Sequence, residues 1–491
     1  MVSPAVAILS ALLKQNNHEV KLFDTSYWEF PERQTVERDK NREKHLQVPA
    51  CKEAQKPVSL HTTNVYDDFN KEINEFEPDL IACSATEDTF PYAIKLLENL
   101  HNKGKAKTIL GGVFATFAPH KAIQYPEIDI VCLGEGEYPL VQLCDRIEKQ
   151  QTYTDIPNLW IKQDGVIFKN RMTSLTDIDS LPLMDLEIFE DSRFYRPFDG
   201  KMYRTIPVET HRGCPYSCAY CNTPGRERLY KDENQRFSRL KSIENVHREL
   251  LFYKNHWQAE YLYFWADTFL ALSNKYLEAF AEMYASEIGL PFWCQTRPET
   301  LTEKRVKLLK KMGVHRINLG IEHGNAQFRE NYLSRKVANK IIVESIHRLS
   351  SYEIKFAVNN IVGLPAETRE LAFDTIELNR QFVADGYNIN IYIPYHGTSM
   401  RDMAEKMGYI DPDTIVSSWV QFSPLNMPQF SKEAIEGIRR CFVPYVFLEK
   451  DRWPEIKLAE KLTSEGDQLW NNIIEECRAR FFSQFSEEDD D

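Results

Sequence analysis

The hydrophobic positions of this chain change period in a regular way between residues 207 and 410. Short runs of β-branched and aromatic residues alternate there with stretches in which apolar residues recur at positions i, i+3, i+4 and i+7. The first pattern predicts buried strands, and the second predicts helices with one apolar face. Their alternation predicts a parallel sheet covered by helices, and six repeats predict a partial barrel. The expected strands are Ile206–His211, Tyr261–Trp265, Pro291–Gln295, Arg316–Leu319, Lys355–Val362 and Asn388–Ile393.

Residues 1–150 show a second α/β pattern, in which a helix with Ala5, Ile8, Leu9 and Leu12 on one face precedes four short apolar runs. This order predicts a doubly wound, Rossmann-like domain. Glycine loops follow the last two runs, and glycine at the carboxyl edge of such a sheet lets the backbone approach a ligand closely. The expected strands are Val20–Asp24, Leu80–Ser84, Thr108–Leu110 and Asp129–Leu133, and the loops contain Gly111, Gly112, Gly134, Glu135 and Gly136.

The composition of the remaining segments predicts a linker, a carboxyl-terminal module, an acidic tail and an insertion in the first domain. Residues 151–200 contain a short hairpin pattern and proline-marked turns, which predict a linker before a barrel at 201–410. Residues 411–485 predict a small helical module, and we expect the acidic tail at 486–491 to be disordered. A long polar insertion at 27–77 interrupts the first domain, and we expect a solvated flap there, with a lid over the interdomain cleft as the alternative.

Charge and composition argue against several classes of protein. The chain carries 73 acidic and 60 basic residues, a net charge of -13, and no nucleic acid is expected as a partner because its binding needs a positive surface. No apolar run approaches the roughly 18 residues of a membrane span, and the amino terminus lacks a signal-peptide pattern. We therefore expect a cytoplasmic protein with no membrane span. Seven of the ten cysteines are scattered along the chain and fit free thiols in a reducing compartment.

Three cysteines stand out by their spacing. Cys214, Cys218 and Cys221 form a C-x3-C-x2-C motif after the first expected barrel strand. Three thiolates at this spacing can hold a [4Fe–4S] cluster and leave its fourth iron without a protein ligand. The alternative is a zinc site completed by His211, because zinc also binds thiolate and imidazole. Structural zinc sites usually pair two cysteine knuckles, and this chain has no second one.

With Tyr220 directly before its third cysteine, the motif resembles the signature of the radical S-adenosylmethionine (SAM) enzymes. The resemblance implies a partial (βα)6 barrel, a [4Fe–4S] cluster on Cys214, Cys218 and Cys221, and SAM bound at the open iron. It also implies reductive cleavage of SAM to a 5′-deoxyadenosyl radical, with an electron donor such as flavodoxin or ferredoxin as a partner.

The same resemblance implies SAM-binding residues at the strand ends. It assigns Asp267 to the methionine amino group, Arg297 to the carboxylate and Glu322 to the ribose. Each residue has a structural alternative. Asp267 would be a helix N-cap, Arg297 would pair with Glu299 at the surface, and Glu322 would form a salt bridge with His323 or Arg316.

Two further stretches belong to this resemblance. Ile361, beside Gly363, is implied to pack on the adenine, whose edge would meet the backbone next to Tyr220. The stretch Tyr395–Met400 is similar to a family segment that usually reads Pro-Gly-Thr, and His396 replaces the proline. A turn before a helix and a substrate contact are the two interpretations of this segment.

The glycine loops in Leu110–Thr116 and Asp129–Pro139 resemble those of the cobalamin-binding domain that precedes many radical SAM barrels. The resemblance implies that residues 1–150 bind cobalamin at the five loop residues named above. The usual first strand of this domain has no counterpart before the first expected helix. No Asp-x-His-x-x-Gly element occurs, so no histidine is expected below the cobalt.

Together the two resemblances imply a cobalamin-dependent radical SAM methyltransferase acting on an unactivated carbon of a small molecule. A radical cyclase or rearrangement enzyme with non-methylating cobalamin is one alternative. A methylthiotransferase-like enzyme with a second cluster on Cys51, Cys83 and Cys132 is another, although the glycine loops and acidic carboxyl terminus argue against it. A non-catalytic cobalamin- or cluster-binding sensor represents a different class. The identity of the substrate stays undetermined, because nothing in the sequence tells whether residues such as Tyr263 and Trp265 contact a ligand or pack against other side chains.

Overall fold

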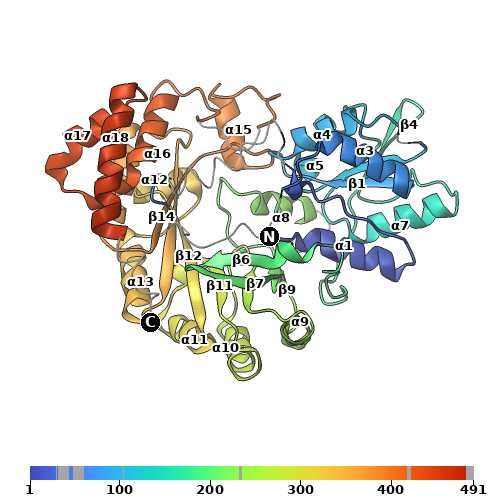
Figure 1. The fold of residues 1–491 in the computed structure, drawn as a ribbon, viewed down its shortest axis with the longest axis horizontal. Coiled ribbons are helices and arrows are strands. Elements are labelled where there is room, and N and C mark those ends of the chain that lie inside the picture. Colours follow the sequence, from blue (N-terminus) through green and yellow to red (C-terminus); the bar gives the residue numbers. More distant parts are fainter. Residues whose placement is uncertain are drawn as a thin grey trace.

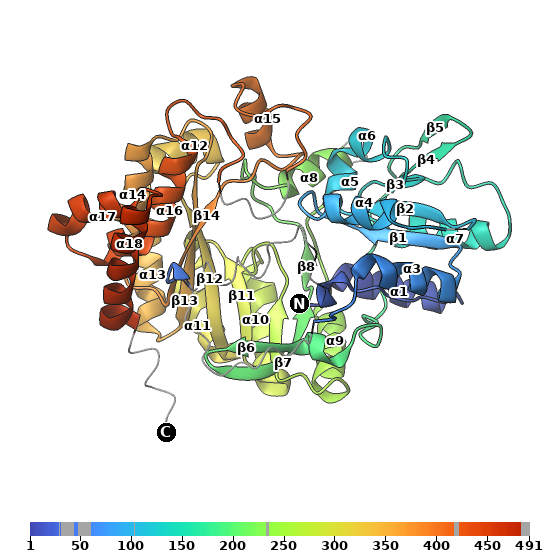
Figure 2. The same ribbon diagram turned by 45° about the horizontal axis from the view of Figure 1, so that its top comes forward.

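The structure is a computed structural model of the 491-residue chain, and it describes residues 1–28, 30, 44–47, 60–102, 104–231, 235–416 and 422–482. The described residues form two α/β domains and a helical module (Figure 1). Figure 2 shows the carboxyl-terminal helices on one side, the larger sheet in the middle and the amino-terminal domain on the other side. The expected tail at 486–491 and about half of the insertion at 27–77 lie outside the described residues. The end of the insertion forms a helix, Val65–Phe76, with Val65 and Phe69 in the core, so the expectation of a solvated flap is wrong there.

Five strands make the sheet of the amino-terminal domain, in the order β1 (Leu80–Ser84), β2 (Lys107–Gly111), β3 (Ile130–Cys132), β4 (Leu159–Gln163) and β5 (Val166–Lys169). The first three strands are parallel, and β4 and β5 form an antiparallel hairpin that pairs with β3. We predicted this hairpin within the linker at 151–200. It forms, and its pairing makes it part of the first sheet.

The helices of this domain are α1 (Pro4–Gln15), α3 (Val65–Phe76), α4 (Phe90–Glu98), α5 (Val113–Phe117), α6 (Pro119–Ala122) and α7 (Glu137–Glu148). The expected first helix is confirmed as α1, which begins where the Ser3 hydroxyl accepts a hydrogen bond from Val6 N. Ile8 is buried as predicted, whereas Ala5 is exposed.

The prediction of a strand at Val20–Asp24 is wrong, because this segment forms no strand in the structure. Phe23 stacks on Trp28 with ring centroids 4.6 Å apart and also packs on Phe69 of α3. Asp24 then caps a short 3-10 helix. The apolar side chain of Phe23 is therefore covered by aromatic rings without sheet pairing.

The larger sheet contains the six expected strands in parallel, and their prediction is confirmed. A seventh strand, which the sequence analysis missed, pairs antiparallel at one edge. In spatial order the strands are β14 (Gly386–Ile391), β13 (Lys355–Val362), β12 (Val314–Glu322), β11 (Phe292–Thr296), β10 (Tyr261–Phe264), β7 (Lys201–Val208) and β6 (Tyr195–Phe198). A separate two-stranded ladder joins β8 (His211–Arg212) and β9 (Arg239–Leu240).

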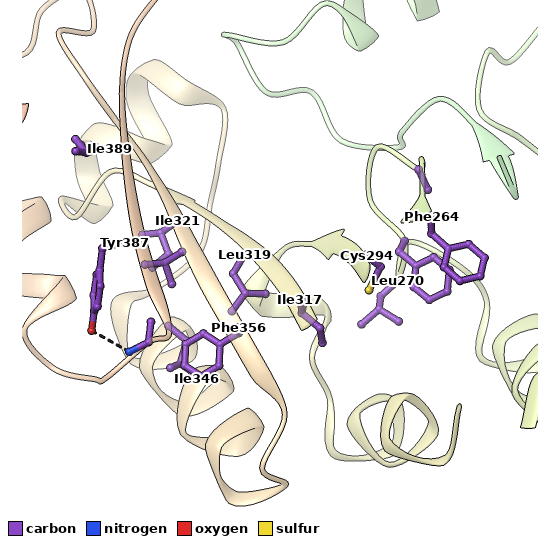
Figure 3. Close-up of a cluster of buried hydrophobic side chains, with 14 of the residues drawn as sticks. Phe264, Leu270, Cys294, Ile317, Leu319, Ile321, Ile346, Phe356, Tyr387 and Ile389 are labelled. Atoms are coloured by element: carbon purple, nitrogen blue, oxygen red, sulfur yellow. Dashed lines mark hydrogen bonds between the residues drawn. The ribbon is translucent and has the colours of Figure 1, made fainter. Parts of the chain in front are cut away.

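Helices cover the outer face of this sheet. Figure 3 shows part of the buried layer between them, in which Leu319 of the sheet packs near Phe356 and Ile346. The helices of the barrel are α8 (Thr223–Lys231), α9 (Ile243–Asn255), α10 (Asn274–Met283), α11 (Glu303–Met312), α12 (Ala326–Leu333), α13 (Asn339–Ser351), α14 (Arg369–Asn379) and α15 (Ser399–Lys406). Of these, α8 and α15 lie toward the amino-terminal domain rather than on the outer face (Figures 1 and 2). The expected partial barrel is therefore present.

The expected carboxyl-terminal module is also present, as α16 (Lys432–Phe447), α17 (Trp453–Ala459) and α18 (Ser464–Cys477). It closes the edge of the sheet, because α16 packs on α14 and β14. Arg369 of α14 donates two hydrogen bonds of 2.6 Å to the buried Glu460 carboxylate. None of the described helices is long and apolar enough to cross a lipid bilayer.

Candidate functional site

The three predicted cluster ligands lie in the loop between β8 and α8, which follows the first parallel strand of the barrel. Backbone hydrogen bonds tie this cysteine loop to two other elements: Ala219 N donates to Leu333 O (3.1 Å), and Met400 N donates to Ala219 O (3.0 Å). Gly213 has φ +91°, and a Cβ there would come within 2.9 Å of the Phe237 ring. The path of the loop therefore requires glycine at this position.

Polar groups contact all three cysteine sulfurs. Thiolate ligands of iron–sulfur clusters accept such hydrogen bonds, which tune the cluster. Burial raises the pKa of the Cys221 thiol to about 11, so without a metal this thiol is neutral. The contacts are Cys214 Sγ with Thr268 Oγ1 (3.3 Å), Cys218 Sγ with Arg297 Nη1 (3.3 Å) and Cys221 Sγ with Thr223 N (3.5 Å).

The spacing of the sulfurs favours a cluster over a closed zinc site. Zn–S bonds of about 2.3 Å in a tetrahedron bring the ligand atoms to about 4 Å from one another. Within the described part of the chain, sets of three or more potential metal ligands lying within 4.8 Å of one another include neither the cysteine sulfurs nor His211. The His211 ring is buried and its Nδ1 hydrogen-bonds to Thr210 Oγ1 (3.1 Å). The donor set fits a [4Fe–4S] cluster, because each cysteine then binds a different iron.

Asp267 lies next to the cysteine loop, three residues after the end of β10. Its Oδ2 accepts a hydrogen bond from Thr223 Oγ1 (3.0 Å), and the residue is exposed. The alternative interpretation as a helix N-cap is wrong, because Ser273 caps α10. An exposed carboxylate beside the cysteine loop is suited to bind an ammonium group.

Glu322 is joined to the cysteine loop by a buried arginine that the sequence analysis missed. Arg335 Nη1 donates to Glu322 Oε1 (3.2 Å) and to Tyr220 OH (2.9 Å). Burial raises the pKa of Glu322, although the charge of Arg335 opposes this shift. Both alternative salt bridges of Glu322 are wrong: Arg316 Nη2 lies 2.7 Å from Asp199 at the amino end of β12, and His323 Nε2 lies 3.3 Å from Glu367 Oε1. Arg335 follows α12 in a polar stretch, so no periodic pattern marked it.

Arg297 is buried against the cysteine loop and also pairs with Glu299. Its Nε donates to Glu299 Oε1 (2.6 Å), and its guanidinium lies 3.8 Å from the centroid of the Tyr216 ring. The predicted ion pair with Glu299 is therefore present, but it lies at the cofactor site rather than at the surface. A role of Arg297 in binding the SAM carboxylate stays a prediction.

Ile361 and Gly363 lie at the carboxyl end of β13. Ile361 is partly buried, and Gly363 adopts φ +80°. The buried Glu367 carboxylate organises the turn, since its Oε2 accepts from Gly363 N (2.6 Å) and Leu364 N (2.9 Å). Glu367 is a second residue that the sequence analysis missed, because a glutamate after a Gly-Leu-Pro turn reads as solvent-exposed.

The two glycines of the first glycine loop differ in how much room the structure leaves for a side chain. A Cβ on Gly111 would meet only Cys83 O at 4.0 Å, and Gly111 pairs in register with the exposed Ser84. A Cβ on Gly112 would clash with Ala85 O at 2.4 Å. The edge formed by β1 and β2 therefore leaves an approach for a large cofactor such as cobalamin at Gly111, whereas Gly112 is needed for packing.

The second glycine loop contacts the barrel. A Cβ on Gly134 would clash with Tyr230 OH of α8, whose oxygen accepts a hydrogen bond from Glu135 N (3.1 Å). The Glu135 carboxylate is 8% exposed and pairs with Arg212 (2.9 Å) and Arg239. Gly134 and Glu135 of this loop therefore join the two domains, whereas a Cβ on Gly136 would meet Cys132 Sγ of its own domain at 3.6 Å. A direct contact of Gly134, Glu135 or Gly136 with cobalamin stays a prediction.

His396 makes a second contact between the domains. Its Nδ1 lies 2.8 Å from Glu87 Oε1 in the loop after β1, and its backbone N donates to Glu87 Oε2 (2.8 Å). Thr398 caps α15 by accepting from Arg401 N (3.2 Å), so the predicted turn before a helix is present. Arg401 Nη1 also approaches Glu87 (3.5 Å).

Two family models match the chain: the radical SAM superfamily at residues 208–378 and the B12 binding domain at residues 50–144. The chain belongs to the radical SAM enzymes that carry an amino-terminal B12-binding domain. The cofactors of this pair of domains are a [4Fe–4S] cluster, SAM and cobalamin. The cysteine loop and the Gly111 edge are the parts of this radical SAM enzyme that fit them.

Known proteins related to this radical SAM enzyme include transferases and cyclases. It is 23% identical to an uncharacterized methyltransferase of Pyrococcus horikoshii over 78% of this chain and 82% of that protein. It is 26% identical to the anaerobic magnesium-protoporphyrin IX monomethyl ester cyclase of Cereibacter sphaeroides, over 69% of this chain and 56% of the cyclase. The fold matches that of the radical SAM methyltransferase TsrM from Kitasatospora setae, with a TM-score of 0.60, 15% identity and coverage of 90% and 79% of the two chains.

Proposed function

We propose that this radical SAM enzyme transfers a methyl group to an unactivated carbon of a small molecule. The observation that carries the proposal is the junction of its two cofactor domains. Arg212, two residues before Cys214, pairs with Glu135 in the loop after β3. Methyl transfer needs both cofactors close to one substrate, and this junction keeps their loops adjacent. When bound, the cluster supplies the electron for SAM cleavage, and cobalamin carries the methyl group.

The side chains around the cysteine loop are suited to the charges of SAM. In this proposal Asp267 accepts hydrogen bonds from the methionine ammonium, and Arg297 donates to the carboxylate. Glu322 accepts from the ribose hydroxyls while Arg335 holds its carboxylate in place. Ile361 offers an apolar surface to the adenine.

A product assay tests the proposal. Protein reconstituted anaerobically with iron, sulfide and cobalamin is incubated with SAM, a reductant and candidate small molecules. Methylation yields both S-adenosylhomocysteine and 5′-deoxyadenosine, so we expect both products in amounts that match the methylated substrate. Formation of 5′-deoxyadenosine with a modified substrate, but without S-adenosylhomocysteine, would contradict methyl transfer.

That second outcome would support radical cyclisation or rearrangement. The similarity to the magnesium-protoporphyrin IX monomethyl ester cyclase favours this alternative. The cyclisation hypothesis needs the same cysteine loop and SAM residues, and the product ratio separates the two functions.

Two other hypotheses have less support. A second cluster would need its cysteines to lie side by side, but Cys83 is on β1 and Cys132 is on β3, with β2 between them. Cys51 lies outside the described residues. Iron analysis distinguishes one cluster from two. A non-catalytic sensor would bind the cofactors and leave SAM intact under every reductant.

The proposal includes an electron donor and a cellular location. Reduction of the cluster requires a low-potential protein such as flavodoxin or ferredoxin, and an oxygen-sensitive cluster fits the cytoplasm. Exchange of chemical reductant for purified flavodoxin in the product assay tests the first part. SAM cleavage with dithionite but not with flavodoxin or ferredoxin would count against it.

A further inference from the structure

The inward face of the larger sheet carries side chains that the cofactor site does not use. Side chains alternate between the two faces of a strand. Phe264 and Leu319 point into the core between sheet and helices (Figure 3). Their sequence neighbours Tyr263 and Asn318 therefore lie on the opposite face, which is turned away from the helices.

Three aromatic side chains, which we call the aromatic wall, form one part of this face. Tyr263 and Trp293 are partners on neighbouring strands, and their rings stack with centroids 4.0 Å apart and planes 10° apart. Trp265 continues the wall, with its centroid 5.8 Å from that of Tyr263. It is 52% exposed and lies two residues before Asp267, so a large ring is open to a ligand beside the cofactor site.

Four asparagines, which we call the amide row, continue the same face across the next three strands. Asn318 Oδ1 accepts a hydrogen bond from Trp293 Nε1 (3.2 Å), which joins the row to the aromatic wall. Asn388 Nδ2 donates to Asn359 Oδ1 (2.9 Å), and Asn390 is exposed near the carboxyl end of β14. Primary amides both donate and accept hydrogen bonds, so the row can match the polar edge of a neutral ligand.

Charged groups lie at the two ends of this face, and several of them are paired there. At the amino end, Asp199 accepts from Arg316 (2.7 Å) and Lys355 (2.9 Å). At the carboxyl end, Arg335 pairs with Glu322. The inward positions between these ends include Tyr263, Trp293, Gln295, Asn318, Ala357, Asn359 and Asn388, all of them uncharged.

We infer that the substrate presents an uncharged, flat ring with hydrogen-bonding groups at its edge to the aromatic wall and the amide row. This inference rests on the proposed function, since it describes the substrate of the same site. An aromatic face packs on Trp265, and donors and acceptors at the ring edge meet the asparagine amides. A carboxylate or phosphate on this part of the substrate would lose its hydration without gaining a cation as partner.

Equilibrium dialysis of the reconstituted enzyme with three matched compounds tests the inference. Naphthalene-2-carboxamide combines a flat ring with a neutral polar edge, naphthalene-2-carboxylate adds a charge, and cyclohexanecarboxamide removes the flat ring. We expect the first compound to bind about tenfold more tightly than either of the others. We also expect Trp265→Ala and Asn390→Ala each to weaken its binding about fivefold. Both side chains are exposed, so neither variant removes buried packing.

The exposed Phe168 of the β4–β5 hairpin provides the control, because Phe168→Ala removes a ring of similar exposure outside the barrel. This variant should bind the carboxamide as the unaltered enzyme does. Equal or tighter binding of the carboxylate, full affinity in Trp265→Ala, or no binding of the carboxamide at millimolar concentration would overturn the inference. SAM cleavage is measured separately, so an enzyme that cleaves SAM but fails this test refutes only the substrate class.

Discussion

Arg212 Nη1 lies 2.9 Å from Glu135 Oε1, so an arginine at the start of the cysteine loop is paired with a glutamate in a glycine loop of the B12-binding domain. The same arginine pairs with Glu137 (2.7 Å), and the Glu135 carboxylate also binds Arg239. Glu135 and Glu137 are buried. Buried, hydrogen-bonded charges with this many partners fix the separation of the loops that carry them.

Glu135→Gln should destabilise the junction. The substitution keeps the shape of the side chain but leaves Arg212 and Arg239 with one buried charge fewer, which costs about 2 kcal/mol of unfolding free energy. Urea denaturation followed by circular dichroism measures this loss. The exposed Glu98 gives a matched control, and Glu98→Gln should change stability by less than about 0.5 kcal/mol. Equal stability of the two variants would show that the junction is weak.

The Glu135 carboxylate should also make the stability of the folded protein depend on pH. Burial raises the pKa of Glu135, but hydrogen bonds and charges from Arg239 and Arg212 outweigh it, so its pKa in the folded protein lies below 4.5. Its contribution to stability is therefore complete above about pH 4.5 and is lost as the pH falls through the lower, folded-state pKa. The stability difference between the unaltered protein and Glu135→Gln should shrink over that range. A difference that stays constant from about pH 6 to about pH 3 would contradict the assignment.

Arg335→Met should disrupt the cofactor site and the fold together. It leaves the carboxylate of Glu322 buried without its cation, which costs about 3 kcal/mol. The adjacent Lys336 is exposed and pairs with Glu330, so Lys336→Met should cost less than about 0.5 kcal/mol. Thermal unfolding of both variants measures the difference. Similar midpoints would mean that Arg335 is not the partner on which Glu322 depends.

Cysteine variants should separate the cluster ligands from core thiols. Cys218→Ala should lose most of the iron after reconstitution, because one iron of the cube loses its ligand. Cys294 is fully buried in β11, so Cys294→Ala should keep the full iron content and lose about 1 kcal/mol of stability from the small cavity. Iron and sulfide analysis measures the outcome. Unchanged iron in Cys218→Ala would exclude this cysteine as a ligand.

The strands of the barrel could be predicted because each one is a buried run whose neighbours follow helical spacing. The structure of Val20–Asp24 could not be predicted in this way, because its apolar pattern looks like that of a strand while Phe23 is covered by stacking on Trp28. The edge strand β6 was missed for the opposite reason: its Tyr-Arg-Pro-Phe sequence is partly exposed and contains proline, which weakens a strand pattern.

The spacing of the three cysteines and the family resemblance predict the cluster ligands, which stay a prediction, but the residues around the cysteine loop could not be predicted. Arg335 and Glu367 lie in polar stretches and become buried only when distant elements meet around them. Glu135 was predicted beside a cofactor, and its pairing with Arg212 depends on how two domains pack. A local pattern carries no information on such partners.

Mössbauer spectroscopy of enzyme reconstituted with 57Fe, recorded with and without SAM, tests most directly whether Cys214, Cys218 and Cys221 hold a cluster with one open iron. We predict a [4Fe–4S] cluster in which one iron of the four changes its spectrum when SAM is added. A cluster whose four irons are all unaffected by SAM, or a protein that retains zinc and assembles no cluster, would contradict the account.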